Sequence, residues 1–105
     1  MKKGKGLVKE YNDYGDLRFE GEYLNGKRNG KGKEYYNNGK LEFEGEYIND
    51  KKNGKGKDYY CGILIYEGEY LNGKRRKGKE YDFDDKLLFA GDYLNGKRVW
   101  IIFIK

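Results

Sequence analysis

The chain has 105 residues, enough for one small domain, and only 36% of them are hydrophobic, so any core must be thin. Its 23 basic and 18 acidic residues give a net charge of +5, and no apolar run is long enough for a membrane span or a secretory signal. One cysteine and no histidine exclude an internal disulfide and the usual zinc and copper sites. We therefore expect a cytoplasmic protein without a metal or a cofactor.

One sequence motif recurs along the chain. The stretch "EGEYLNGKRNGKGKEYY" begins at Glu20, and variants of it begin at Glu44, Glu67 and Ala90, so the period is 24, 23 and 23 residues. A period of this size is typical of repeat architectures. We assign a single repeat domain over residues 1–105, with a half-unit at 8–19 and repeats at 20–43, 44–66, 67–89 and 90–105, of which the last is truncated.

The first half of each repeat alternates between two kinds of side chain. Phe43, Gly45 and Tyr47 share one face of an extended chain, whereas Glu44 and Glu46 lie on the other. This alternation predicts a β-strand, and it recurs in the other repeats. Opposite charges on the next strand pair with these glutamates across strands, which needs no function.

Turn signals separate the strands of each repeat. Asn-Gly and similar dipeptides tolerate the positive φ of tight hairpin turns. They occur at Asn25-Gly26, Asn49-Asp50, Asn72-Gly73 and Asn95-Gly96, with second turns at Asn38-Gly39, Cys61-Gly62 and Asp84-Asp85. Each repeat is therefore a β-hairpin, and the fold class is all-β, an elongated antiparallel meander. We count nine strands, from Lys9–Tyr11 to Val99–Ile104.

Glycine inside these strands needs an explanation, because a strand glycine marks a bend or a close approach of other atoms. Gly45 lies between the aromatic residues Phe43 and Tyr47 on one face. We expect an aromatic ring from an adjoining strand to lie flat over each glycine, so that the core consists of rings on backbone.

These repeating residues resemble the MORN repeat, named for membrane occupation and recognition nexus. The aromatic-x-Gly-x-aromatic pattern of that family falls on Phe19, Gly21 and Tyr23, on Phe43, Gly45 and Tyr47, on Tyr66, Gly68 and Tyr70, and on Phe89, Gly91 and Tyr93. Its later Gly-x-Gly falls on Gly30 and Gly32 and on Gly54 and Gly56, but the third repeat keeps only Gly78. The stretch from Tyr35 to Tyr47 is also similar to a MORN-like variant in bacterial proteins described as antitoxins.

The resemblance implies a non-catalytic module that scaffolds other proteins or sits at membranes. We favour a protein-interaction scaffold, whose partner, of unknown identity, lies against the aromatic and glycine stripe formed by those twelve residues or along the open edge of the sheet.

The alternative is peripheral binding to an anionic, phosphoinositide-rich membrane through basic hairpin tips. The candidate residues are Lys27, Arg28, Lys51, Lys52, Lys74, Arg75, Arg76, Lys77, Lys97 and Arg98. A simpler interpretation is that these lysines keep exposed edges from aggregating. Because acidic residues are interspersed among the basic ones, nucleic acid is a less favoured partner.

An enzyme is not expected. Glu44 and Glu46 form a carboxylate pair, but equal pairs recur in the other repeats, whereas a catalytic site places its acid and base in different environments. Asp82, Asp84 and Asp85 lack the closing glutamate of a calcium loop.

The last segment, "VWIIFIK" from Val99 to Lys105, is too short to cross a bilayer and would aggregate if exposed. Three interpretations remain open, in this order: it caps the last hairpin, it pairs with a second copy to make a homodimer, or it marks a truncated array.

Overall fold

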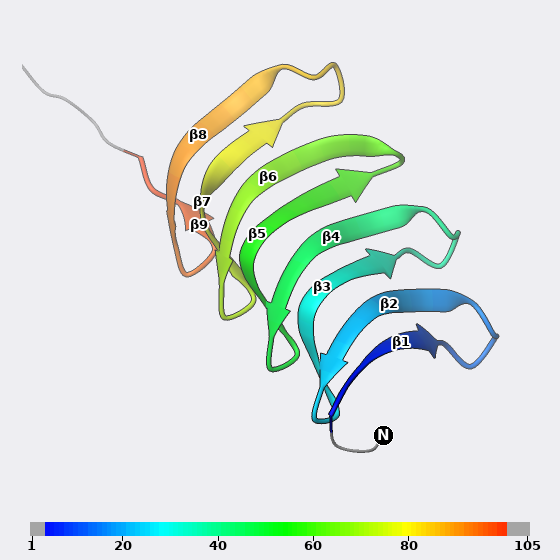
Figure 1. The fold of residues 1–105 in the computed structure, drawn as a ribbon. Helices are drawn as coiled ribbons and strands as arrows, with labels where there is room; N and C mark the ends of the chain where they lie inside the picture. Colours follow the sequence, from blue (N-terminus) through cyan, green and yellow to red (C-terminus); the bar gives the residue numbers. More distant parts are fainter. Residues whose placement is uncertain (1–3, 101–105) are drawn as a thin grey trace, which may run out of the picture.

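A computed structural model describes residues 4–100, which form one antiparallel sheet of nine strands and no helix (Figure 1). The strands are β1 (Lys5–Tyr11), β2 (Leu17–Leu24), β3 (Lys27–Tyr35), β4 (Leu41–Ile48), β5 (Lys51–Tyr60), β6 (Ile63–Leu71), β7 (Lys74–Tyr81), β8 (Leu87–Leu94) and β9 (Lys97–Arg98). Their order in the sheet is their order in the chain. The predicted all-β meander is thus confirmed.

Tight turns of the expected kind connect the strands. Asn25 and Gly26, between β2 and β3, have φ values of 50° and 84°, the pair of positive angles that a two-residue type I′ turn requires. Cys61 and Gly62, between β5 and β6, have φ values of 51° and 80°. The turns that connect β2 to β3, β4 to β5, β6 to β7 and β8 to β9 lie along one side of the sheet, and the other four turns lie along the opposite side (Figure 1).

The strand register brings seven glycines into one row, which we call the glycine row. Its members are Gly21, Gly32, Gly45, Gly56, Gly68, Gly78 and Gly91, each paired with the next. A Cβ atom added at Gly45 would lie 2.5 Å from the carbonyl oxygen of Lys55 and 2.7 Å from the Cα atom of Gly56. Because both are backbone atoms, this position has no room for a side chain.

Aromatic rings lie over the glycine row. A Cβ atom at Gly45 would lie 2.7 Å from the Phe43 ring, and one at Gly56 would lie 2.6 Å from the same ring. The predicted packing of rings on bare backbone is therefore confirmed in the main. It is wrong in one detail, because Phe43 covers a glycine of its own strand as well as one of the adjoining strand.

A bulge beside the glycine row accounts for the irregular third repeat. Between β4 and β5 the register shifts next to Glu46, whose carboxylate accepts a hydrogen bond of 2.7 Å from the Lys55 backbone N–H near Gly54. The corresponding shift between β6 and β7 is smaller and contains no glycine. There, Arg76 pairs with Glu69 at 2.8 Å. The one residue missing from the third repeat therefore shortens a bulge and leaves the strand pairing intact.

The molecule is an elongated ribbon of about 60 × 28 × 18 Å, as the sequence predicts. The prediction for the last strand is wrong where it can be compared, because Val99 and Trp100 are not in a strand. The rest of that predicted strand, and the tail to Lys105, lie outside the described residues.

Candidate functional site

One face of the sheet, the aromatic face, carries the core. Its buried rings belong to Phe19, Phe43, Tyr47, Tyr66, Tyr70, Phe89 and Tyr93, and Tyr23 packs beside them half-buried. Neighbouring rings meet edge to face, with 5.4 Å between the centroids of Phe19 and Tyr47 and 5.3 Å between those of Phe43 and Tyr70. The aromatic stripe that the sequence predicts as a partner-binding surface is thus the core, and a partner has no access to rings that are 0% exposed, such as Phe43.

Cations cover these rings and join acids of neighbouring strands. The Arg28 guanidinium lies 4.1 Å from the Phe19 ring centroid and pairs with Glu10 at 2.9 Å and Glu34 at 2.7 Å. Lys52 lies 4.1 Å from the Phe43 centroid. We call this arrangement the ion-pair ladder, and its cations also make cation–π contacts with the rings of Phe19, Phe43, Tyr66 and Phe89.

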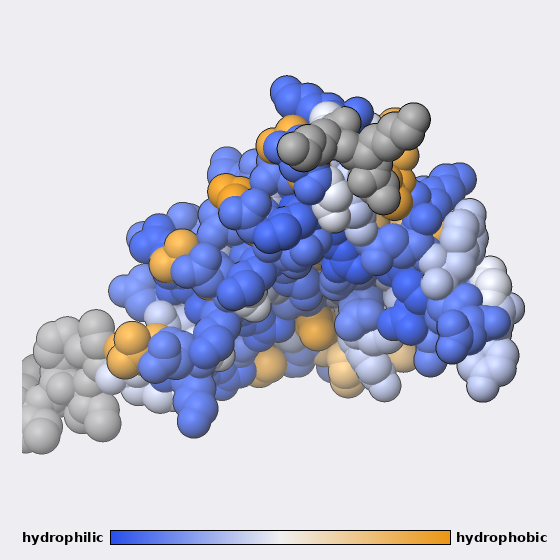
Figure 2. Space-filling model, turned by 90° about the horizontal axis from the view of Figure 1, so that it is seen from below, coloured by the Kyte–Doolittle hydropathy of each residue, from blue (hydrophilic) through white to orange (hydrophobic). Residues whose placement is uncertain are grey.

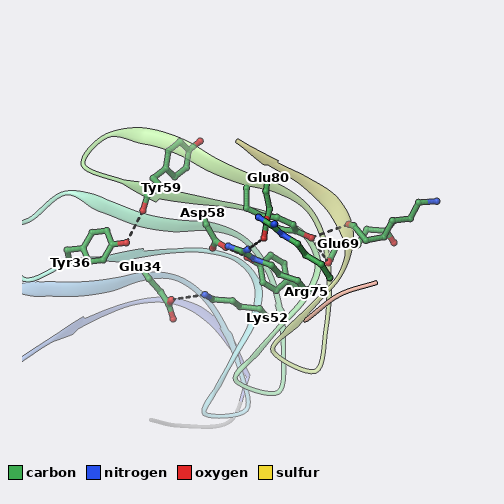
Figure 3. A network of polar contacts seen from close by, with 12 residues as sticks. Glu34, Tyr36, Lys52, Asp58, Tyr59, Glu69, Arg75 and Glu80 are labelled. Atoms are coloured by element: carbon green, nitrogen blue, oxygen red, sulfur yellow. Dashed lines mark hydrogen bonds and ion pairs between the residues drawn. The ribbon is translucent and has the colours of Figure 1, made fainter. Parts of the chain in front are cut away.

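The ladder continues into the last repeats. Arg75 pairs with Asp58 and Glu80, both at 2.8 Å, and Arg98 pairs with Glu80. Figure 3 shows Asp58, Arg75 and Glu80 converging on one another, with the pair of Glu34 and Lys52 beside them. These half-buried groups hold successive hairpins together.

The charges of the ladder perturb one another. Burial alone would raise the pKa of Glu10, but hydrogen bonds from Arg28 and Tyr23 lower it below its usual range. Burial disfavours the charged form of Arg75, yet its bond to Asp58 raises the pKa of the guanidinium. Both groups therefore stay ionised, as an ion-pair ladder requires.

The opposite face, the charged face, carries the residues on either side of each glycine. In the strand register, Glu44 lies directly opposite Lys33 and Lys57 of the two neighbouring strands, and Glu46 lies opposite Lys31. The Tyr59 hydroxyl donates a hydrogen bond of 2.7 Å to Glu44. Burial and then this carboxylate raise the pKa of Tyr59 to about 12, so the hydroxyl stays protonated.

A groove of about 1310 Å³ runs along the charged face from β1 to β7. The backbone of the glycine row, except Gly91, forms its floor, and lysine and glutamate side chains of the two neighbouring rows form most of its walls. The surface that Figure 2 shows from below is mostly hydrophilic, with separate hydrophobic spots repeated along one border. Side chains at the positions of the glycine row would point to the aromatic face, where the Phe43 ring covers Gly45 and Gly56, so the floor on the charged face consists of backbone alone.

Comparison with protein families agrees with this geometry. The MORN repeat profile matches residues 19–40, 43–57 and 66–84, more than half of the chain. The chain belongs to the MORN repeat family. A search of curated proteins found no matching relative. The matched stretches contain the aromatic rings and glycines of β2 to β6. The residues that define the MORN pattern are therefore those that pack the core.

The basic residues predicted for the lipid alternative divide into three groups in the MORN sheet. Arg28, Lys52, Arg75 and Arg98 belong to the ion-pair ladder and are not free tip charges. Arg76 pairs with Glu69, and Lys77 lines the groove. The remaining tip lysines are exposed: Lys27, Lys51, Lys74 and Lys97. The sequence analysis missed this division because it depends on the cross-strand pairing at each tip, which places Arg28 opposite Tyr23 and Lys27 opposite Leu24.

The groove itself is not among the predicted sites. Its signal is present in the sequence, since Lys55 and Lys57 flank Gly56 while Glu44 and Glu46 flank Gly45. Cross-strand pairing accounts for these charges without a groove, so the sequence alone does not single them out. No described residue belongs to a helix that could cross a membrane, and no metal-binding group of acids and cysteine occurs among residues 4–100.

Proposed function

We propose that this MORN repeat protein is a non-catalytic scaffold that holds an extended segment of a partner protein in the groove of the charged face. The observation that carries the proposal is the long groove with a floor of bare glycine backbone. At about 4.8 Å per strand, the seven strands from β1 to β7 provide about 29 Å, the length of roughly nine extended residues. The rigid sheet presents this site without rearrangement.

The layout of the groove favours an extended segment. Its floor is backbone, and rows of charged side chains line it on both sides along its length. Extended peptides are recognised by contacts of this kind, spread along the segment.

The test is to select binders from a library of nine-residue peptides and to map them by NMR on the labelled protein. We expect amide shifts at Gly32, Gly56 and their neighbours. Lys55→Glu should abolish binding, whereas Lys51→Glu, the same charge change at an exposed tip, should leave it unchanged. Binders that shift only tip residues, or that ignore Lys55→Glu, would contradict the proposal.

A second candidate is the peripheral binding of anionic membranes, which one observation favours. At three of the tips an exposed lysine is paired across the turn with an exposed aliphatic side chain, as Ile48 is with Lys51. A basic residue near an anionic leaflet contributes about 1 kcal/mol, and an aliphatic neighbour can enter the interface. The exposed tips therefore combine both kinds of contact.

Vesicle co-sedimentation separates this candidate from the first. Changing Lys27, Lys51, Lys74 and Lys97 to glutamine should abolish binding to phosphoinositide vesicles if the tips are responsible. The matched control changes Lys9, Lys33, Lys57 and Lys79, four lysines of the charged face, to glutamine. Equal loss in both variants, or binding that survives high salt, would reject a specific role for the tips.

A further inference from the structure

The charges of the groove walls change sign from one strand to the next. On the charged face, β3, β5 and β7 each present two lysines, whereas β2, β4 and β6 each present two glutamates. The lysines are Lys31, Lys33, Lys55, Lys57, Lys77 and Lys79. The groove therefore carries alternating positive and negative stripes across its length.

The carboxylates of the negative stripes already have partners. Glu44 accepts a hydrogen bond of 2.7 Å from the Tyr59 hydroxyl, and Glu46 accepts one of 2.7 Å from a backbone N–H. Glu69 pairs with Arg76 at 2.8 Å. Equivalent hydrogen bonds hold Glu20, Glu22 and Glu67. These bonds fix the glutamates in place, and Arg76 also neutralises Glu69.

The lysines of the positive stripes differ from the glutamates in this respect. All six are exposed, and none forms an ion pair within 4.0 Å with a residue of the described part of the chain. The charges in the groove that are available to a partner are thus the positive ones.

The positive stripes have a spacing that suits one peptide pattern. Lysine-bearing strands are two strands apart, a distance of about 9.6 Å. Three residues of polyproline II span about 9.3 Å and complete one turn, so every third side chain of such a segment lies on the same face. Acidic side chains at every third residue would therefore reach successive positive stripes, whereas in a β-strand they would alternate between its two faces. Acids at every second residue, about 6.7 Å apart, would fall on the glutamates as well.

Continuous polyanions do not match this pattern. A DNA duplex carries one charge per about 1.7 Å of its axis, so its phosphates would lie over negative stripes as often as over positive ones. A peptide with neutral residues between its acids avoids that repulsion.

We infer that the segment recognised in the groove is a peptide in polyproline II conformation with aspartate or glutamate at every third residue over about nine residues. This inference rests on the proposed scaffold function and specifies the partner of the same groove. Three acids, one for each of β3, β5 and β7, fill the pattern.

The experiment compares synthetic nine-residue peptides by fluorescence anisotropy with the full chain. The first has glutamate at positions 1, 4 and 7 in a background of alanine and serine, and the second has the same composition with glutamate at positions 1, 3 and 5. The third has glutamine, and the fourth lysine, at positions 1, 4 and 7. We expect the first to bind at least tenfold tighter than the second and the fourth not to bind.

Protein variants locate the effect. The double change Lys55→Gln and Lys57→Gln removes the middle positive stripe and should weaken the first peptide at least tenfold. The matched control, Lys51→Gln with Lys74→Gln, removes two exposed tip charges and should change binding less than twofold. Thermal melting of both variants checks that they remain folded.

The outcomes separate this inference from the scaffold proposal. Equal binding of the first and second peptides, with amide shifts in the groove, would overturn the three-residue pattern and leave the groove as a peptide site. Absence of groove shifts with every peptide, including binders selected from a library, would overturn both.

Discussion

The interior of the sheet and its C-terminal end contain the same kinds of residue, a buried ring and a cation beside it, but pack them differently. In the interior, Phe43 is 0% exposed and the Lys52 ammonium lies 4.1 Å from its ring centroid. At the end, Phe89 is 7% exposed and the Arg98 guanidinium lies 5.4 Å from its centroid. The repeat unit is therefore tight only where another unit follows it.

The glycine row shows the same difference. A Cβ atom at Gly45 would lie nearest to backbone atoms of β5, whereas one at Gly91 would lie nearest to the Phe89 ring, at 3.1 Å. β9 has two residues and pairs only with the tip of β8, so no described strand covers the rest of that edge. Each hairpin thus depends on the next one for its packing, as in repeat proteins whose units contact only their neighbours.

The largest expected effect is a matched pair of glycine changes. Gly45→Ala should destabilise the protein by about 3 kcal/mol, because the added methyl group overlaps backbone that cannot move aside. Gly91→Ala should cost less than about 1 kcal/mol, because a ring can tilt away. Urea denaturation measures both, and equal losses would show that the end is as tightly packed as the interior.

The sequence predicts the fold and the ring-on-glycine packing because strand alternation and turn dipeptides are local signals. Phe43, Gly45 and Tyr47 lie where the alternation places them. The role of Arg75 is not predictable in that way, since it depends on acids from β5 and β7 meeting over a ring of β6. The groove also depends on the register of seven strands, which no single repeat specifies.

The next expected effect concerns the ion-pair ladder. Arg75→Met should cost about 1 to 2 kcal/mol, because it leaves Asp58 and Glu80 half-buried with fewer partners. Arg98→Met should cost less than about 0.5 kcal/mol, because Arg98 pairs with one acid and is more exposed.

Urea denaturation at low and high salt measures both changes, with thermal melting as a check of cooperativity. If Arg98→Met costs as much as Arg75→Met, the ladder would be equally strong at the end of the sheet.

High pH offers a smaller and more selective test of the interior. Burial raises the pKa of Tyr66 from its model-compound value of 10 to about 12. The folded state disfavours tyrosinate at Tyr66. The contribution of this residue to the stability of the fold is therefore complete below pH 10 and is lost as the pH rises towards about 12. Unfolding in this range should coincide with tyrosinate absorbance.

Tyr66→Phe is the matched variant, since the equivalent residues Phe19, Phe43 and Phe89 lack the hydroxyl. It removes hydrogen bonds of 3.1 Å to the carbonyl oxygens of Glu69 and Lys77, at a cost of about 1 kcal/mol near neutral pH. Its stability should fall less between pH 10 and about 12 than that of the unmodified chain. An identical pH profile would mean that other tyrosines, such as Tyr59, control alkaline unfolding.

The smallest expected effect is on the charged face. Lys57→Gln in the interior and Lys79→Gln near the end should each change stability by less than about 0.5 kcal/mol, because both side chains are exposed and have no ion pair within the described chain. Unlike the glycine and arginine pairs, these two should not differ, since the difference between interior and end arises on the aromatic face. A loss of more than about 1 kcal/mol of stability in Lys57→Gln alone would show that cross-strand charges stabilise the interior. Substitutions of the groove lysines in binding experiments would then also affect the fold.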